Sequence, residues 1–110
     1  MFDKGAYVFC AEDKGNLVGY ITLSKKGEIA YLAVLKKFHG RGIGSNLLKK
    51  IIFFVKKNKI KKLFLDVRND NLSAIMLYLK KGFVVGGLHE KKIGKNEIIK
   101  LRMERVFSMT

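Results

Sequence analysis

Three closely spaced glycines are the feature of this sequence most able to do chemistry. Gly40, Gly42 and Gly44 stand between an apolar run and an amphipathic run that begins at Ile43. A helix starting there would present first-turn amides that lack an internal acceptor, together with the positive end of the helix dipole. Glycines also let the backbone approach an anion closely. The spacing therefore predicts a site for a phosphate or diphosphate group.

Several kinds of glycine turn compete for this pattern. A Rossmann dinucleotide site needs G-x-G-x-x-G, but Leu47 stands where the last glycine should be. A P-loop needs Gly-Lys followed by Ser or Thr after a four-residue gap, and the sequence contains no such run. A diphosphate loop of another kind and a plain tight turn before a helix both remain open from the glycines alone.

Overall composition narrows the classes of partner. The chain has 110 residues, with 23 Lys plus Arg against 9 Asp plus Glu, and a formal charge of +14 that favours anionic partners. The length predicts one domain spanning 1–110. The basic residues occur as pairs scattered among apolar runs, which indicates solvated faces of amphipathic elements and no specific nucleic-acid surface.

Metal and membrane sites are not indicated. Cys10 is the only cysteine and the two histidines are far apart in the sequence, so no metal site is predicted. No apolar run approaches the roughly 20 residues that a bilayer span requires, and the N-terminus carries no secretory signal. We therefore expect a cytoplasmic protein that does not enter a membrane.

The chain around the glycines has the pattern of a mixed α/β fold. Three strand patterns separated by turn residues predict an antiparallel meander before the loop. The helix after the loop should bring the next strand parallel to the third. A Rossmann fold would instead begin with a helix between parallel strands. The predicted elements are strands at Ala6–Glu12, Leu17–Ser24, Glu28–Val34 and Lys62–Val67, helices at Ile43–Lys57 and between Asn71 and Gly82, a strand from Phe83, a loop at Gly86–Asn96 and a closing strand at Glu97–Arg105.

Two stretches resemble signatures of one family, the GCN5-related N-acetyltransferases (GNAT). The first signature is a Gln or Arg followed by x-x-Gly-x-Gly or Ala; Gly42 and Gly44 match it, and His39 replaces the Gln or Arg. The second is Asn-x-x-Ala, then Leu-Tyr, then Gly-Phe. Both stand in the right order with the right elements between them. The second signature is matched by Asn71, Ala74, Leu77, Tyr78, Gly82 and Phe83.

The resemblance implies a GNAT-like mixed sheet in which two parallel strands splay apart, with acetyl-CoA as co-substrate and no metal. Backbone groups of Leu32 and Val34 would bind the pantetheine amides, and Asn71 would hydrogen-bond the cofactor arm, cap its helix, or do both. Amides of the glycine loop would hold the CoA pyrophosphate. That loop comprises His39, Gly40, Arg41, Gly42, Ile43, Gly44 and Ser45.

The resemblance also implies the catalytic roles. Tyr78 would protonate the departing thiolate, since a phenol and a thiolate have comparable basicity. Glu28 would be the base, directly or through water. Without the motif, Tyr78 would be a core residue and Glu28 a solvated carboxylate at a strand end. The predicted activity is N-acetyl transfer to a small-molecule or protein amine by direct attack on the thioester; the alternative is a non-catalytic acyl-CoA-binding or regulatory domain.

One part of the family pattern has no counterpart. The family begins with a strand and a pair of helices that form part of the acceptor side, and Met1–Gly5 leaves no room for them. We expect either a minimal or truncated domain, or a second chain, such as a homodimer partner, that completes this side.

Overall fold

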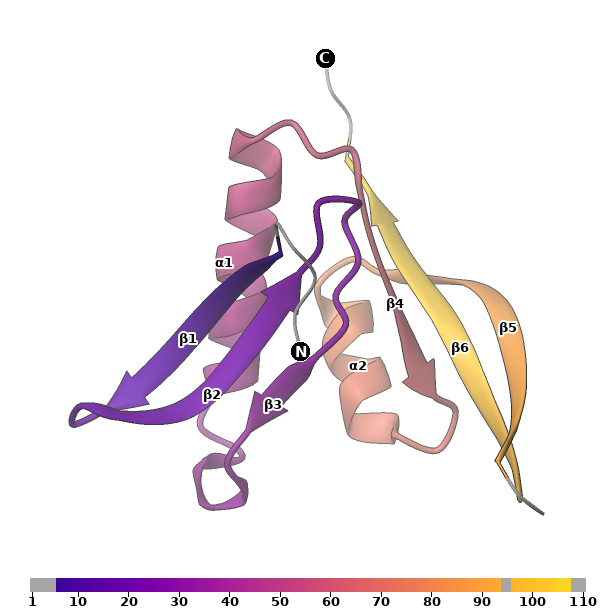
Figure 1. The fold of residues 1–110 in the computed structure, drawn as a ribbon, viewed down its shortest axis with the longest axis horizontal. Coiled ribbons are helices and arrows are strands. Elements are labelled where there is room, and N and C mark those ends of the chain that lie inside the picture. Colours follow the sequence, from indigo (N-terminus) through magenta and orange to yellow (C-terminus); the bar gives the residue numbers. More distant parts are fainter. Residues whose placement is uncertain (1–5, 94–95, 108–110) are drawn as a thin grey trace.

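The computed structural model describes residues 6–93 and 96–107. They form two three-stranded antiparallel sheets that diverge from a common junction, with both helices on one side (Figure 1). The strands of the first sheet lie in the order β1-β2-β3, and those of the second in the order β4-β6-β5. The elements are β1 (Tyr7–Asp13), β2 (Asn16–Leu23), β3 (Leu32–Val34), a 3-10 turn η1 (Lys36–Phe38), α1 (Ile43–Lys57), β4 (Lys62–Arg68), α2 (Leu72–Lys80), β5 (Val84–Ile93) and β6 (Asn96–Val106).

Helix α1 has the bounds that the sequence predicted. Gly42 precedes it in a left-handed conformation, with φ of 79°, and Asn58 ends it. Its apolar residues recur at helical spacing and are buried, so this face packs into the core while the lysines stay outside. The buried residues of α1 are Leu47, Leu48, Ile51, Ile52 and Val55.

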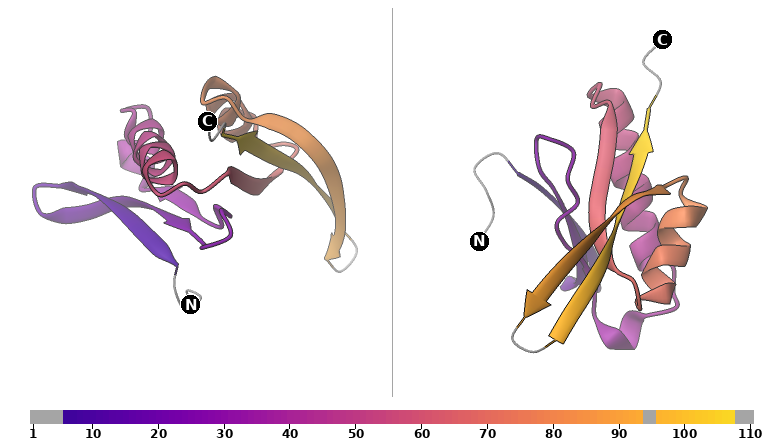
Figure 2. Two further views of the ribbon diagram at one scale, coloured as in Figure 1. Left: turned by 90° about the horizontal axis from the view of Figure 1, so that it is seen from above. Right: turned by 90° about the vertical axis from the view of Figure 1, so that its right-hand side faces the viewer.

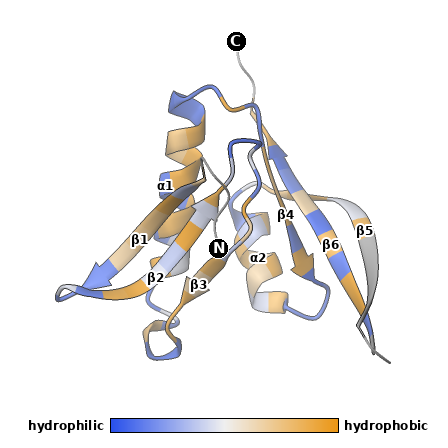
Figure 3. Ribbon diagram, in the orientation of Figure 1, coloured by the Kyte–Doolittle hydropathy of each residue, from blue (hydrophilic) through white to orange (hydrophobic). Residues whose placement is uncertain are grey.

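The core lies where the two helices meet the two sheets. Alternate residues of β4 are buried, namely Leu63, Leu65 and Val67, and residues of β2 and β6 join them. The alternation along β6 is visible as hydrophilic and hydrophobic bands in Figure 3. The predicted fold class, an antiparallel meander followed by a helical crossover, is confirmed. No helix in the described part of the chain is long and apolar enough to cross a membrane.

Among the described residues, backbone hydrogen bonds join the two sheets at one place along β4. The N–H of Phe64 donates to the carbonyl of Gly27 at 3.0 Å, and the N–H of Ile29 donates to the carbonyl of Phe64 at 2.9 Å. A parallel bridge, Glu28 to Phe64, lies between these bonds. Beyond it β3 and β4 separate, as predicted for splayed strands; Figure 2 shows the two sheets diverging.

The predicted strand Glu28–Val34 is wrong in extent, because only Leu32–Val34 is a strand. The N–H of Tyr31 donates to the Thr22 side-chain hydroxyl at 3.1 Å, and the N–H of Glu28 donates to the Ser24 hydroxyl at 3.0 Å. The two hydroxyl groups thus accept hydrogen bonds from amides that would donate to backbone carbonyls in a regular strand pair. Residues 29–31 therefore form an irregular link along the edge of the first sheet.

The predicted loop Gly86–Asn96 is also wrong, because most of it belongs to β5. β5 pairs with β6 along its whole length, and the register shifts between Val85 and Gly87. Glycines of this kind usually indicate a loop, but here they accommodate a bulge inside a long strand. The hydrogen bonds with β6 thus outweigh the local preference of these glycines for a loop.

Candidate functional site

The glycine loop and the start of α1 present a run of uncommitted backbone amides. Within the described residues, no backbone hydrogen bond uses an N–H of residues 40–45 as its donor; the first bond of α1 runs from the N–H of Asn46 to the carbonyl of Gly42. Gly40 and Gly42 both have positive φ, near 78°, and no side chain caps α1. Successive free amides at a helix start form a site for an anion.

These amides border a hollow of about 560 Å³ that reaches toward α2. Most of the predicted loop residues line it. Arg41 and Ile43 do not: the Arg41 guanidinium lies over the Phe38 ring, 4.9 Å from its centroid, and Ile43 packs against the core. The lining residues are Leu32, Val34, Phe38, His39, Gly40, Gly42, Gly44, Ser45, Asn71, Ser73, Ala74 and Leu77.

His39 ties the loop to β3. Its Nε2 lies 2.8 Å from the carbonyl oxygen of Val34. A carbonyl can only accept, so Nε2 must carry the proton in this contact. The imidazole thus lies beside the hollow while its donor is directed at the strand end.

A second hollow, of about 280 Å³, occupies the opening between β3 and β4. The carbonyl of Tyr31 accepts from Thr22 and the N–H of Leu35 donates to Val18, so both backbones point toward β2. Backbone direction alternates along a strand, so Leu32 and Val34 point away from β2 and into the opening. The backbone of Leu32 therefore faces this hollow. The backbone of Val34 faces the hollow of the glycine loop, where its carbonyl accepts from His39.

The opposite wall follows the same alternation. Phe64 is directed at the first sheet through its bonds to Gly27 and Ile29, so the backbones of Asp66 and Arg68 also face the opening. Their side chains lie on the face away from the helices, because Leu65 and Val67 are the buried ones. The lining of the opening thus includes Tyr78 from the helix side and Asp66 and Arg68 from the opposite face of the sheets.

Tyr78 projects from α2 into this second hollow. It is 6% exposed, and its ring packs against Phe83 with centroids 5.6 Å apart. Among the described residues its hydroxyl has no hydrogen-bond partner. No fully buried side-chain N or O atom in that part of the chain lacks a partner, so the Tyr78 oxygen itself must be accessible to solvent. Burial raises the pKa of Tyr78, which keeps the phenol protonated at neutral pH.

The two carboxylates near the junction are placed differently. Glu28 is half-buried beside the Phe64 bridge and is not among the residues that line the opening. Asp66 does line it, and the sequence analysis missed this residue. Its carboxylate accepts from Arg102 at 2.7 and 3.2 Å, and this hydrogen bond raises the pKa of Arg102. An acidic residue between the apolar residues Leu65 and Val67 was the available signal.

Asn71 occupies the corner between the two hollows. Its side-chain oxygen accepts from the N–H of Ala74 at 3.3 Å, which confirms the predicted helix cap. It also lines both hollows, so cofactor contact and capping are compatible. Leu32, Asn71 and Ala74 line both hollows, so the hollow of the glycine loop adjoins the one that Tyr78 lines.

Comparison with protein families gives a match over most of the chain. The model of the Acetyltransferase (GNAT) family matches residues 1–83. The N-alpha-acetyltransferase RimI of Mycobacterium tuberculosis is 34% identical over 88 residues, which cover 74% of this chain and 54% of that protein. Streptothricin acetyltransferase A of Bacillus subtilis is 30% identical over 89 residues, covering 77% of this chain and 50% of that protein. The chain therefore spans about half the length of these relatives.

Solved structures share the fold. The ribosomal-protein-S18-alanine N-acetyltransferase of Escherichia coli superposes with a TM-score of 0.87 at 22% identity, covering 99% of this chain and 74% of that one. A GNAT family acetyltransferase of Elizabethkingia anophelis with acetyl-CoA bound gives a TM-score of 0.78 at 21% identity, covering 94% of this chain and 77% of that one.

Proposed function

The chain belongs to the GNAT acetyltransferase family, and from this premise we propose that it transfers an acetyl group from acetyl-CoA to a primary amine. The observation that carries the proposal is the run of free amides at residues 40–45, which opens onto a cleft that ends at Tyr78. Acetyl-CoA has a negatively charged diphosphate, an extended arm with amide groups and a reactive thioester. These would lie at the free amides, along the cleft and beside Tyr78, in that order.

Binding would rest mainly on backbone groups. The diphosphate of the cofactor would accept from the free amides at the start of α1, where the helix dipole adds positive potential. The pantetheine amides would pair with Leu32 and Val34, extending the edge of β3 as a strand would. The acetyl-CoA held by the Elizabethkingia anophelis protein, which shares this fold, supports the choice of cofactor.

The transfer needs a neutral amine and a protonated leaving group. The amine nitrogen attacks the thioester carbonyl, forming a C–N bond; the C–S bond then breaks, the nitrogen loses a proton and the sulfur gains one. The Tyr78 hydroxyl, protonated and open to the cleft, would deliver that proton. The backbone amide of Leu32, which lines the same hollow as Tyr78, would donate to the developing oxyanion.

We assign reception of the amine to the face opposite the helices. Asp66 and the exposed Tyr31 border the opening on that face, so a cationic amine would meet a carboxylate before it reaches the thioester. Asp66 would take the amine proton directly or through water. Glu28 remains the candidate from sequence, but it stands beside the closed junction and outside the cleft lining.

The acceptor is proposed only as a class. The relatives' names include an N-alpha-acetyltransferase, a ribosomal-protein-alanine N-acetyltransferase and a streptothricin acetyltransferase. We therefore propose a primary amine on a protein N-terminus or a small molecule. A non-catalytic acyl-CoA-binding or regulatory role is the competing outcome.

The proposal is tested by thiol release from acetyl-CoA in the presence of an amine panel. The panel contains peptides with free N-termini, lysine peptides with blocked N-termini, a polyamine and streptothricin, and each amine is paired with its acetylated form as control. At least one free amine should accelerate thiol release while its acetylated form does not. Saturable acetyl-CoA binding without amine-dependent release across the panel would assign the binding role instead.

A further inference from the structure

Charges of opposite sign meet on the face of the second sheet that points away from the helices. β4 and β6 pair in register, so residues of the two strands stand opposite one another on this face. Toward the closed end of the junction, the Lys62 ammonium lies 3.0 Å from the Glu104 carboxylate. Further along, Asp66 lies opposite Arg102 and accepts from it at 2.7 and 3.2 Å. Each of these two cations thus has a carboxylate partner.

At the open end the next opposite pair is positive on both strands. Arg68 of β4 lies opposite Lys100 of β6, and both residues line the hollow between β3 and β4. Like charges that stand directly opposite in a sheet repel each other. Arg68 donates to Asp70 at 3.0 and 3.2 Å, but these side chains are 56% and 64% exposed, so solvent screens the pair. In the described part of the chain, Lys100 has no ion pair.

The Lys100 side chain reaches the hollow across β4. β6 is the middle strand of its sheet, and β4 lies between it and the opening (Figure 1). The backbone of Lys100 is therefore too far back to line the hollow, and its side chain must do so. Lys100 is only half-exposed, so water screens its charge less than that of a fully exposed lysine.

The cofactor does not neutralise this charge in the proposed binding mode. The diphosphate of acetyl-CoA is assigned to the amides of residues 40–45, which border the other hollow. The part of acetyl-CoA assigned to the hollow between β3 and β4 carries amides and a thioester, and these groups have no negative charge. The carboxylate that Lys100 can bind must then come from the acceptor.

We propose that the acceptor is a peptide N-terminus with Asp or Glu among its first two residues. This inference rests on the proposed function and narrows its acceptor class. The α-amine lies at Asp66, and the side-chain carboxylate of the peptide pairs with Lys100. Lys100 stands opposite Arg68, two residues beyond Asp66 on β4, which corresponds to about 7 Å along a strand. A carboxylate one carbon from the amine is too close to span this distance, whereas a side-chain carboxylate of the first or second residue spans it.

The same charges disfavour cationic acceptors. A polyamine, or a peptide with lysine as its second residue, would bring a further positive charge beside Arg68 and Lys100. Repulsion of this kind selects against an acceptor as effectively as a favourable contact selects for one.

The test uses isomeric peptides that differ only in where one glutamate stands. Each is an eight-residue peptide with a free N-terminus and an amidated C-terminus, and its glutamate is the first, second or eighth residue of an otherwise neutral sequence. All three have the same net charge, so the general attraction of a protein with a formal charge of +14 is the same for each. For thiol release from acetyl-CoA, kcat/KM should be at least about fivefold higher with glutamate first or second than with glutamate last.

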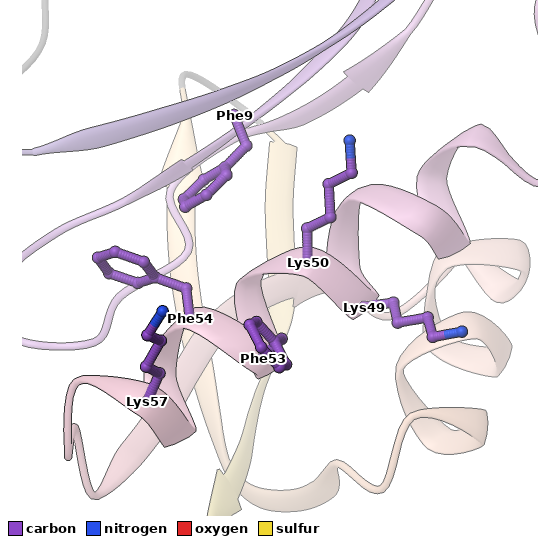
Figure 4. Close-up of a pocket in the computed structure, with 6 residues that line it drawn as sticks. All are labelled: Phe9, Lys49, Lys50, Phe53, Phe54 and Lys57. Carbon is purple, nitrogen blue, oxygen red and sulfur yellow. The ribbon is translucent and has the colours of Figure 1, made fainter.

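Matched variants assign this preference to one side chain. Lys100→Met removes the charge at similar length and should bring the ratio between early and late glutamate close to one. Lys100→Glu should reverse the choice, so that a peptide with lysine second is preferred to one with glutamate second. The control is Lys57→Met, which removes a lysine from a separate groove between β1 and α1 (Figure 4) and should leave the ratio unchanged.

Binding is measured separately, so that the proposed function and this inference can fail independently. A tryptophan in the middle of each peptide reports binding to the protein saturated with CoA, because the protein itself contains no tryptophan. If no peptide releases thiol but early glutamate still binds more tightly through Lys100, the transfer reaction is refuted and the acceptor preference stands.

Three results would overturn the inference itself. The first is a ratio near one for the natural protein in both rate and binding. The second is a preference for early glutamate that survives Lys100→Met. The third is a KM for acetyl-CoA raised about tenfold in Lys100→Met with the peptide ratio unchanged, which would place this lysine at the cofactor and not at the acceptor.

Discussion

The junction between the two sheets has a closed end, where backbone groups pair with each other, and an open end, where they do not. At the closed end, Phe64 exchanges hydrogen bonds with Gly27 and Ile29. At the open end, Leu32 faces Asp66 and Arg68 across a hollow of about 280 Å³, and Val34 lines the adjoining hollow of the glycine loop. One end satisfies its amides and carbonyls within the protein, whereas the other directs them at a space that an amide-bearing ligand can fill.

The position where the strands separate therefore determines the site. Hydroxyls of Ser24 and Thr22 take the amides of Glu28 and Tyr31, and this interrupts a regular strand just past the bridge. The bridge holds the sheets together at one point, and the interruption lets them diverge from there. Substitutions at the closed end should thus act on stability, and those at the open end on the reaction.

The largest effect is expected for Gly27→Ala at the closed end. Gly27 has φ of 96°, and a Cβ there would lie 2.1 Å from the carbonyl oxygen of Lys62. Backbone must move to relieve this clash, so the free energy of unfolding should fall by about 3 kcal/mol or more. Thermal unfolding should show Tm lower by about 10 °C or more.

Gly15→Ala is the matched control for this substitution. Gly15 also has positive φ, 81°, but a Cβ there would meet nothing within 4 Å. It should cost only about 1 kcal/mol, from backbone conformation alone. Equal losses for the two variants would mean that the contact at Phe64 and Lys62 does not hold the sheets together.

The second largest effect is expected at the open end, for Tyr78→Phe. Loss of the proton donor should lower kcat about 100-fold, within the range for general acids. KM for acetyl-CoA should change by less than about threefold, because the ring and its contact with Phe83 remain. Steady-state kinetics checks both values, and an unchanged kcat would remove Tyr78 from the chemistry.

The same variant tests the alkaline limit of stability. Burial raises the pKa of Tyr78 above its ordinary value of 10.0, so above pH 10 the unfolded chain releases this proton before the folded protein does. The stabilisation is complete below pH 10 and is lost as pH rises through the folded pKa. Unfolding between pH 9 and 12 should therefore show a steeper decline for the natural protein than for Tyr78→Phe.

The sequence predicted the features that depend on local pattern. Helix α1 follows from glycines at its start and apolar residues at helical spacing, and its bounds were predicted as Ile43–Lys57. The Asn71 cap likewise follows from residues within three positions of each other. The splaying of the two strands was predicted from the family resemblance and not from composition or residue spacing.

Features set by contacts between distant segments were missed. Most of β5, from Gly86 onward, was predicted as a loop because its glycines gave no hint of the long ladder with β6. The extent of β3 depends on the Thr22 hydroxyl, which accepts a hydrogen bond from the N–H of Tyr31, nine residues away. Asp66 lines the opening only because β4 and β3 separate there.

A smaller effect should distinguish the two carboxylates. Asp66→Asn should lower kcat about tenfold, since the acceptor loses a nearby carboxylate within the cleft. Glu28→Gln, at the closed end, should lower it less than about threefold. Rates measured against pH with the best amine of the panel check this comparison. The reverse order would restore Glu28 as the base and would contradict the separation of roles between the two ends.

The smallest effect is expected for His39→Ala in the glycine loop. Its imidazole donates to the carbonyl of Val34, whereas in our proposal the amides of residues 40–45 would be the donors to the diphosphate. Removing the side chain should therefore weaken acetyl-CoA binding only about threefold, through a less fixed loop. Calorimetric titration with acetyl-CoA checks this value, with His39→Gln retaining a donor as control. A loss of about 30-fold or more in His39→Ala would show that the side chain, and not the backbone, dominates anion binding at the open end.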